Sequence, residues 1–270
     1  MTESGFLEID GARVYYEADG TGDAVLLIHG GLGSLRMWDA QVPAFAERYS
    51  VIRYDNRGWG RTDTDDVPFS DATDAAMVLD RLGAETAHVI GQSRGGSIAL
   101  DLVLSSPHRV ASFVSVAGGI GGFEAPVDES VDPPPWEEME RLWEAKDWDA
   151  LADLETRVWV DGWGQPPDRV DPELRRTVHD WIVEGYRVEK PWGQPQALDP
   201  LAVGRLGEIT VPTLVMIGEV DAPAEVAAGE PLAASVKGAR RVVFPGVAHM
   251  IHMEDPGRFN QVVLDFLAGI

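Results

Sequence analysis

The 270-residue chain contains no cysteine, so disulfides, thiolate metal sites and a cysteine nucleophile are excluded. Basic residues are scarce, because 22 Lys and Arg stand against 45 Asp and Glu and give a formal net charge of −23. A surface this acidic repels phosphate backbones and anionic lipid headgroups, so we predict neither a nucleic acid nor a membrane as a partner. The hydrophobic fraction of 44% is too high for a disordered chain.

Two kinds of segment are also missing. The chain does not start with a basic segment followed by an apolar one, and no apolar run approaches the length of a membrane span. These absences predict a cytoplasmic protein. The length suits one α/β core with room for an insertion rather than two independent domains.

The segments that are present alternate between strand and helix patterns. Asp10-Gly11 joins residues 6–10 to residues 13–18 as a two-residue hairpin. Continuous apolar runs predict buried strands, and helical spacing predicts helices between them. The expected later strands cover 24–28, 50–54, 110–117, 211–218 and 240–244, and the expected helices cover 38–48, 71–82, 222–234 and 256–267. This alternation predicts an α/β fold with a doubly wound, mostly parallel sheet.

The pattern changes between residues 119 and 199, which hold seven of the nine tryptophans. Helical spacing over 136–143, 149–159 and 172–186 predicts an inserted helical lid, so the chain divides into core residues 1–118, a lid at 119–199 and core residues 200–270. Any one tryptophan here is typical of core packing. Together they indicate an apolar or aromatic pocket wall, for which we select Trp159 and Trp163, with Leu32 as a third pocket residue.

Ser93 stands between two glycines, in Gly91-Gln92-Ser93-Arg94-Gly95, after an apolar run and before a helical pattern. Glycine at 91 and 95 avoids the collisions that side chains would cause in so tight a turn. This pattern resembles the nucleophile elbow of the α/β-hydrolase superfamily. Five loosely defined positions also match by chance, but the strand before and the helix after favour the functional interpretation.

A serine nucleophile needs a histidine base, and the base needs a carboxylate. The resemblance implies the chain order serine, acid, histidine. Residues 244–256 are similar to the histidine loop of the family, which places the base at His249 and leaves His252 as a structural or pocket residue. His29 is expected to bind loop backbone.

The candidate acid follows the strand predicted over 211–218. Asp221 matches the family's position, three residues after the glycine that ends the strand, and Glu219 is the competing candidate. An isolated aspartate after a strand is ordinarily a cap or turn residue. The correct order of serine, acid and histidine favours Asp221 as the catalytic acid.

Two glycine-containing loops complete the resemblance. The family draws its oxyanion-hole amides from the residue after the nucleophile, here Arg94, and from the loop at 29–34, where Gly31 is our choice and Leu32 the second. Such a loop is equally compatible with a plain turn, and it lacks the spacing of a P-loop or a dinucleotide fingerprint. Residues 55–62 are similar to a structural segment of the family, in which Asp55 and Arg57 are expected to bind loop backbone.

The chain departs from the family next to the nucleophile. Arg94 replaces a residue that is usually apolar, and Gln92 replaces a common histidine. A guanidinium beside a partly buried serine needs a carboxylate partner or water. The partner is either an acid of this chain or a carboxylate on the substrate, and the two remain open.

The resemblance implies a serine hydrolase that cleaves a small ester, lactone or related carbonyl compound through an acyl-enzyme, with neither cofactor nor metal. The expected substrate is a small molecule that is apolar or aromatic, or that carries a carboxylate. Carbon–carbon bond hydrolysis and cofactor-free perhydrolysis use the same triad and remain alternatives. A ligand-sensing or signalling relative with slow turnover is the alternative outside enzymes. The oligomeric state is not predicted.

Overall fold

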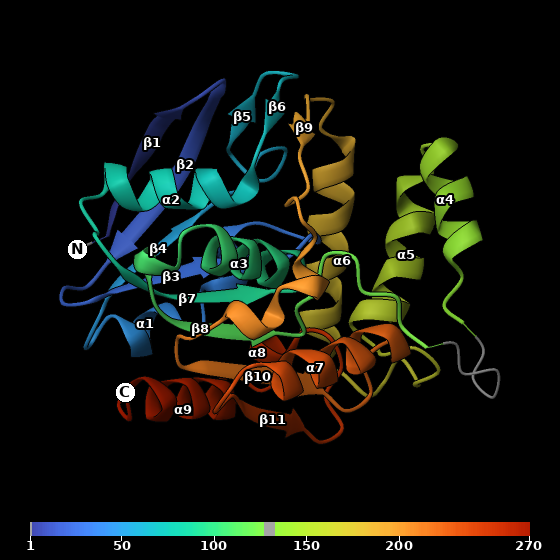
Figure 1. Ribbon diagram of the computed structural model, residues 1–270. Coiled ribbons are helices and arrows are strands. Elements are labelled where there is room, and N and C mark those ends of the chain that lie inside the picture. The colour runs from blue at the N-terminus through green and yellow to red at the C-terminus, as the bar shows by residue number, and fades with distance from the viewer. Residues whose placement is uncertain (1, 127–132) are drawn as a thin grey trace.

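The computed structural model describes residues 2–126 and 133–270, and its centre is a twisted sheet (Figure 1). Within these residues the sheet has the spatial order β1 (Glu3–Ile9), β2 (Ala12–Asp19), β4 (Ser50–Tyr54), β3 (Ala24–Ile28), β7 (Ala87–Gln92), β8 (Val110–Val116), β10 (Thr213–Gly218) and β11 (Arg240–Phe244). The strands from β4 to β11 are parallel, while β1 and β2 form an antiparallel pair that joins β4. The predicted mostly parallel sheet is confirmed.

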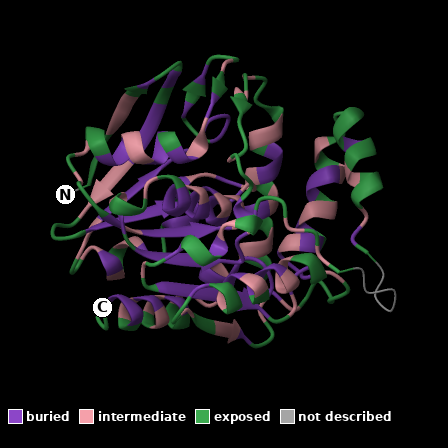
Figure 2. Cartoon of the chain, viewed as in Figure 1, coloured by how far each residue is buried: buried purple, intermediate pink, exposed green. Residues whose placement is uncertain are grey.

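Helices cover both faces of the sheet and bury one apolar core on each. Strand β3 shows how, because Leu26 and Ile28 pack into the core under α2 (Asp71–Arg81), α3 (Arg94–Ser105) and α7 (Pro223–Ser235). Val25 and Leu27 point the other way, into the core with α1 (Val42–Phe45) and α9 (Pro256–Leu267). A strand that is buried on both faces reads as a continuous apolar run. Figure 2 shows this buried sheet between more exposed helices.

Most predicted helix ends agree with the structure, and one helix does not. The Ser70 hydroxyl accepts a hydrogen bond from the Thr73 amide and caps α2. The helix predicted over 38–48 is wrong, because the structure has a 3-10 helix, Leu35–Trp38, and then the short α1. Pro43 explains the difference, since a proline is tolerated in the first turn of a helix but breaks its interior.

Several short elements were not predicted. They are β5 (Asp63–Thr64), β6 (Pro68–Phe69), β9 (Gln194–Pro195) and α8 (Ile251–Glu254). Strand β5 pairs with β2, and β6 pairs with β9 in a small parallel sheet of its own. Elements of two to four residues have no periodicity that a sequence pattern could reveal.

The three helices predicted in the tryptophan-rich region are confirmed as α4 (Trp136–Glu144), α5 (Trp148–Trp159) and α6 (Pro172–Arg187). They form the helical segment, which Figure 1 shows beyond the carboxyl ends of β7 and β8. A small core that includes Ala152 and Ile182 packs this segment against Met37 and Met250. Across the described part of the chain, no helix is both long and apolar enough to cross a membrane.

Candidate active site

Ser93 occupies a strained turn between β7 and α3. Its φ of 53° and ψ of −120° are rare for a residue with a side chain. A Cβ at Gly91 would collide with the Gly95 carbonyl oxygen, and a Cβ at Gly95 would collide with the carbonyl oxygen of Ile28 on β3. The Ser93 amide donates a 2.9 Å hydrogen bond to the Val116 carbonyl on β8. The surrounding strands therefore hold the serine in this conformation, and glycine is required on both sides of it.

His249 and Asp221 meet at the same end of the sheet. The carboxylate of Asp221, which follows β10, lies 2.8 Å from Nδ1 of His249, which follows β11, and both side chains are buried. The second oxygen of Asp221 accepts a 2.7 Å hydrogen bond from the Ala222 amide. Because a carboxylate only accepts, Nδ1 of His249 carries the proton and Nε2 keeps a lone pair.

The charges around His249 favour its protonated form. Burial alone would lower the His249 pKa, but the charge and hydrogen bond of Asp221 and the charge of Glu225 outweigh it and raise the pKa above 6.5. The competing acid, Glu219, is turned away and accepts a 2.8 Å hydrogen bond from the Gly246 amide. The contact with His249 that we predicted for Asp221, rather than for Glu219, is therefore present.

The other histidines near the site have structural surroundings. The His252 ring packs against Trp38 with 4.4 Å between centroids, it is fully buried, and burial lowers its pKa to about 3. His29 donates from Nδ1 to the Gly30 carbonyl at 2.6 Å and accepts the Asn56 amide at Nε2 at 2.9 Å. Both ring nitrogens of His29 are thus used by loop backbone, as expected.

Ser93 and His249 line one cavity of about 300 Å³. We call its wall of Gly31, Leu32, Trp59, Ser93, Arg94 and His249 the sheet side, and its wall of Trp143, Glu155, Trp159, Tyr186 and Trp192 the helical side. The predicted pocket residues Leu32 and Trp159 are both here, and the Trp159 ring lies 4.7 Å from the His249 ring. Trp163 is not among the described residues that line the cavity, and it lies instead by the Arg157 guanidinium, 6.0 Å away.

Five lining residues were missed by the sequence analysis: Trp59, Trp143, Glu155, Tyr186 and Trp192. Tryptophans 143 and 192 belong to the tryptophan-rich region, so the signal for them was present but did not single them out. Glu155 carried no such signal, because it is one acid among the 45 acidic residues of the chain.

Two backbone amides are available at the cavity. Those of Arg94, the first residue of α3, and Gly31, in the loop after β3, donate no hydrogen bond to another part of the described chain. Both residues line the cavity beside Ser93. The loop is kept tight by Gly30, where a Cβ would collide with the side-chain oxygen of Gln92. The amide at the start of α3 also has the favourable field of the helix N-terminus.

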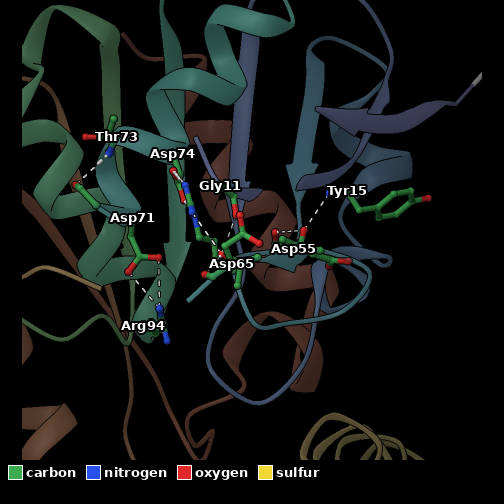
Figure 3. Close-up of polar contacts among 12 residues, drawn as sticks. Gly11, Tyr15, Asp55, Asp65, Asp71, Thr73, Asp74 and Arg94 are labelled. Atoms are coloured by element: carbon green, nitrogen blue, oxygen red, sulfur yellow. Dashed lines mark hydrogen bonds and ion pairs between the residues drawn. The ribbon is translucent and has the colours of Figure 1, made fainter. Parts of the chain in front are cut away.

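The Arg94 side chain pairs with an acid of this chain. Its Nη2 lies 3.3 and 3.2 Å from the two carboxylate oxygens of Asp71, at the start of α2 (Figure 3). The guanidinium is 33% exposed and lines the cavity as well. The sequence left two kinds of partner open for Arg94, an acid of this chain or a carboxylate of the substrate, and the structure shows an acid of this chain.

The loop after β4 supports the site through buried charges. Asp55 accepts hydrogen bonds from the amides of Leu35 and Arg61 at 2.8 and 2.7 Å, and burial raises its pKa to about 6 against these bonds. The prediction that Arg57 binds loop backbone is wrong. Arg57 forms a buried bidentate pair with Asp74 at 2.6 and 2.8 Å, because a guanidinium with both acceptors within reach matches a carboxylate edge. Figure 3 shows Asp74 and Asp55.

The described residues contain no group of three or more His, Cys, Asp or Glu side chains that could hold a metal ion. The cavity brings together a serine hydroxyl, an imidazole held by a carboxylate and two free amides, and it is also lined by Arg94, Glu155 and Tyr186.

The chain resembles known proteins in sequence and in fold. A family model described as the alpha/beta hydrolase fold matches residues 23–256. A 2-hydroxy-6-oxononadienedioate/2-hydroxy-6-oxononatrienedioate hydrolase of Paraburkholderia phymatum is 31% identical over 94% of this chain and 91% of its own. A local match, 44% identical over 110 residues, covers 40% of this chain and 42% of RutD, a candidate carbamate hydrolase of Azorhizobium caulinodans. A solved structure of Est816, described as an N-acyl homoserine lactone degrading enzyme, superposes with a TM-score of 0.76 at 28% identity, covering 97% of this chain and 100% of that one.

Proposed function

Because the chain belongs to the α/β-hydrolase fold family, we propose that it is a serine hydrolase that cleaves a small ester, lactone or related carbonyl substrate through an acyl-enzyme. Ser93 is the nucleophile in this proposal, His249 the general base and Asp221 the acid. The observation that carries it is the 2.8 Å contact between His249 and Asp221 in a cavity that Ser93 also lines.

The proposed reaction starts with proton transfer. Nε2 of His249 accepts the Ser93 hydroxyl proton as Oγ attacks the substrate carbonyl carbon. Asp221 holds the imidazole in the required tautomer and stabilises its protonated form, consistent with the raised pKa of His249. His249 then gives the proton to the leaving oxygen, and the acyl group remains on Ser93. A water molecule, activated by His249 in the same way, then attacks the acyl-enzyme and releases the carboxylic acid product and free Ser93.

In this proposal two backbone amides donate hydrogen bonds to the negatively charged oxygen of the tetrahedral intermediate. The amides of Gly31 and Arg94 are unused by the described chain and border the cavity next to Ser93. Removing one such donor typically lowers kcat by about 100-fold or more. In this proposal residues 119–199 act as a lid, because α5 and α6 supply the wall that faces the nucleophile.

Carbon–carbon bond hydrolysis is the second candidate, favoured by the 31% identity to the Paraburkholderia enzyme. The substrate in that relative's name is a dioate, so it carries two carboxylates. In this chain Glu155 lies in the cavity wall, and the cation of Arg94 is already met by Asp71. A carboxylate-bearing substrate is repelled by Glu155, and Asp71 already offsets part of the Arg94 charge, so we rank the ester or lactone activity above it.

The test is covalent trapping followed by turnover. A fluorophosphonate should label Ser93 alone, located by peptide mass spectrometry, and Ser93→Ala should reduce hydrolysis of esters and lactones by about 10⁴-fold or more. Its melting temperature should stay near that of the parent protein, which separates lost chemistry from lost folding. Labelling at another serine, or full activity in Ser93→Ala, contradicts the assignment. Cleavage of a ring-fission diketone with no ester or lactone activity favours the second candidate.

A further inference from the structure

The helical side of the cavity contains a carboxylate without a cation. Among the described residues, the only side-chain donor to Glu155, on α5, is the Tyr186 hydroxyl of α6, which lies 3.0 and 3.1 Å from its two oxygens. Glu155 forms no ion pair with any residue that the structure describes. One hydroxyl proton leaves most of the acceptor capacity of a carboxylate unused. Burial raises the pKa of Glu155 to about 7, although the hydrogen bond from Tyr186 acts in the opposite direction.

Aromatic rings line the same cavity as this carboxylate. The Trp143 ring meets Tyr186 at 5.0 Å and 87°, and Trp59 meets Trp192 at 4.9 Å and 83°. Trp143 and Trp192 lie 6.4 Å apart and connect the two pairs. Rings at steep angles to one another form the walls of a cage, and their faces carry partial negative charge. Trp143 is 44% exposed, which leaves the cage open to solvent at its edge.

Neither Arg94 nor Lys190 supplies the counter-charge of Glu155. Asp71, which does not line the cavity, meets the charge of Arg94. The Lys190 ammonium donates to the backbone carbonyls of Trp59, Gly60 and Thr62 at 3.4, 3.0 and 2.8 Å. Because Lys190 does not line the cavity and Arg94 is paired with Asp71, the lining charge that has no counter-ion among the described residues is the negative charge of Glu155. The net charge of −23 on the chain also draws cations toward it.

We propose that the cavity binds an ammonium group of the substrate against its helical side, with Glu155 as the counter-ion. Trp143, Trp192 and Tyr186 of that side, together with Trp59 of the sheet side, form an aromatic cage. The substrate class is then a small ester or lactone that carries a quaternary or protonated amine. An ammonium between aromatic faces and a single carboxylate gains both cation–π and ion-pair attraction in a partly desolvated site. This inference rests on the proposed function, and it assigns the wall opposite the nucleophile to selection.

The binding test does not need turnover. Ser93→Ala protein is titrated by calorimetry at pH 8 with choline, with its neutral carbon isostere 3,3-dimethylbutan-1-ol, and with the anion 3,3-dimethylbutanoate. Choline should bind about tenfold more tightly than the neutral alcohol. Adding Glu155→Gln, which keeps the shape and the contact with Tyr186, should remove that preference and leave the alcohol unchanged. Glu144→Gln removes the same charge from the exposed end of α4 and should change neither.

Equal affinity for choline and the alcohol overturns the proposal, and so does a preference for the anion, which would assign the cavity to Arg94 instead. Loss of choline binding in Glu144→Gln as large as in Glu155→Gln also overturns it, because the effect would then belong to net charge. The melting temperature of each variant checks that the comparison is made on folded protein.

A turnover arm separates this inference from the proposed function. Parent protein is given acetylcholine and its neutral isostere 3,3-dimethylbutyl acetate, and kcat/KM is expected to be about tenfold higher for the cationic ester. Hydrolysis of both esters at the same rate, without choline binding, overturns the cage and leaves the hydrolase standing. Choline binding with no hydrolysis of any ester overturns the hydrolase and leaves the cage standing.

Discussion

The two walls of the cavity manage charge in opposite ways. On the sheet side every charged group has a partner within the chain, since Asp221 holds His249 and Asp71 holds Arg94. On the helical side Glu155 has only a neutral hydroxyl. A wall with completed contacts keeps reacting groups in place, whereas a wall with an unmatched charge leaves binding capacity for a ligand. The comparison assigns chemistry to the sheet side and recognition to the helical side.

The largest effect is expected from breaking the sheet side at its acid. Asp221→Asn should lower kcat by about 10⁴-fold, because an amide can favour the wrong tautomer and cannot stabilise the imidazolium. The pH profile should change as well. In the parent protein kcat/KM should fall as the pH drops through the His249 pKa, which lies above 6.5. In the variant this pKa should be lower, because the Asp221 charge no longer raises it.

Glu219→Gln is the matched control, because Glu219 is an acid on the same loop that bonds the Gly246 amide instead. It should keep kcat within about threefold, as expected for a surface substitution. If Glu219→Gln and Asp221→Asn exchange their effects, the assignment of the acid is wrong.

The next effect concerns the stability of the loop after β4, which supports the sheet side. Arg57 and Asp74 are almost fully buried, with side-chain exposures of 1% and 6%. Asp74→Asn leaves the guanidinium without its counter-charge and should lower the free energy of unfolding by about 3 to 5 kcal/mol, measured by urea denaturation. Glu138→Gln removes an acid from the exposed pair with Arg141 on α4 and should change stability by less than about 1 kcal/mol. Equal effects would show that burial does not decide the value of these pairs.

The smallest effect sharpens the contrast on the helical side. The Glu155 pKa is about 7 in the folded chain and 4.5 ordinarily, so between these values the folded protein keeps a proton that the unfolded chain releases. The free energy of unfolding therefore falls as pH rises through this range. Glu155→Gln should remove this loss and be more stable than the parent by about 1 to 3 kcal/mol above pH 7.

The measurement is the difference in stability between Glu155→Gln and the parent at pH 4.5 and pH 8. A difference is needed because Asp55 and Asp101, with pKa values raised to about 6 by burial, titrate in the same range. The same difference at both pH values would mean that Glu155 is not the unmatched acid that the contacts indicate.

The sheet side could be read from the sequence far better than the helical side. Ser93, Asp221 and His249 each lie in the turn or loop after a predicted strand, so the strand pattern locates them at the same edge of the sheet. The Arg94 pair could be stated only as two alternatives, because Asp71 lies 23 positions away and no pattern specifies which acid a guanidinium meets.

The helical side depends on how helices pack. Glu155 and Tyr186 are 31 positions apart, on α5 and α6, and meet only because those helices lie against one another. An acid on an amphipathic helix is ordinarily solvated, so the sequence pattern favours the wrong environment for Glu155. The prediction that Trp163 lines the cavity differs from the structure for the same reason, since helical spacing does not say which tryptophan faces the sheet.

The most direct test of the division between the two walls compares Asp221→Asn with Glu155→Gln on acetylcholine and 3,3-dimethylbutyl acetate. The account predicts that Asp221→Asn lowers kcat by the same factor on both esters. It predicts that Glu155→Gln lowers kcat/KM about tenfold on the cation and leaves the neutral ester unchanged. Equal losses on both esters in Glu155→Gln, or a charge-dependent loss in Asp221→Asn, would contradict the assignment of chemistry to one wall and recognition to the other.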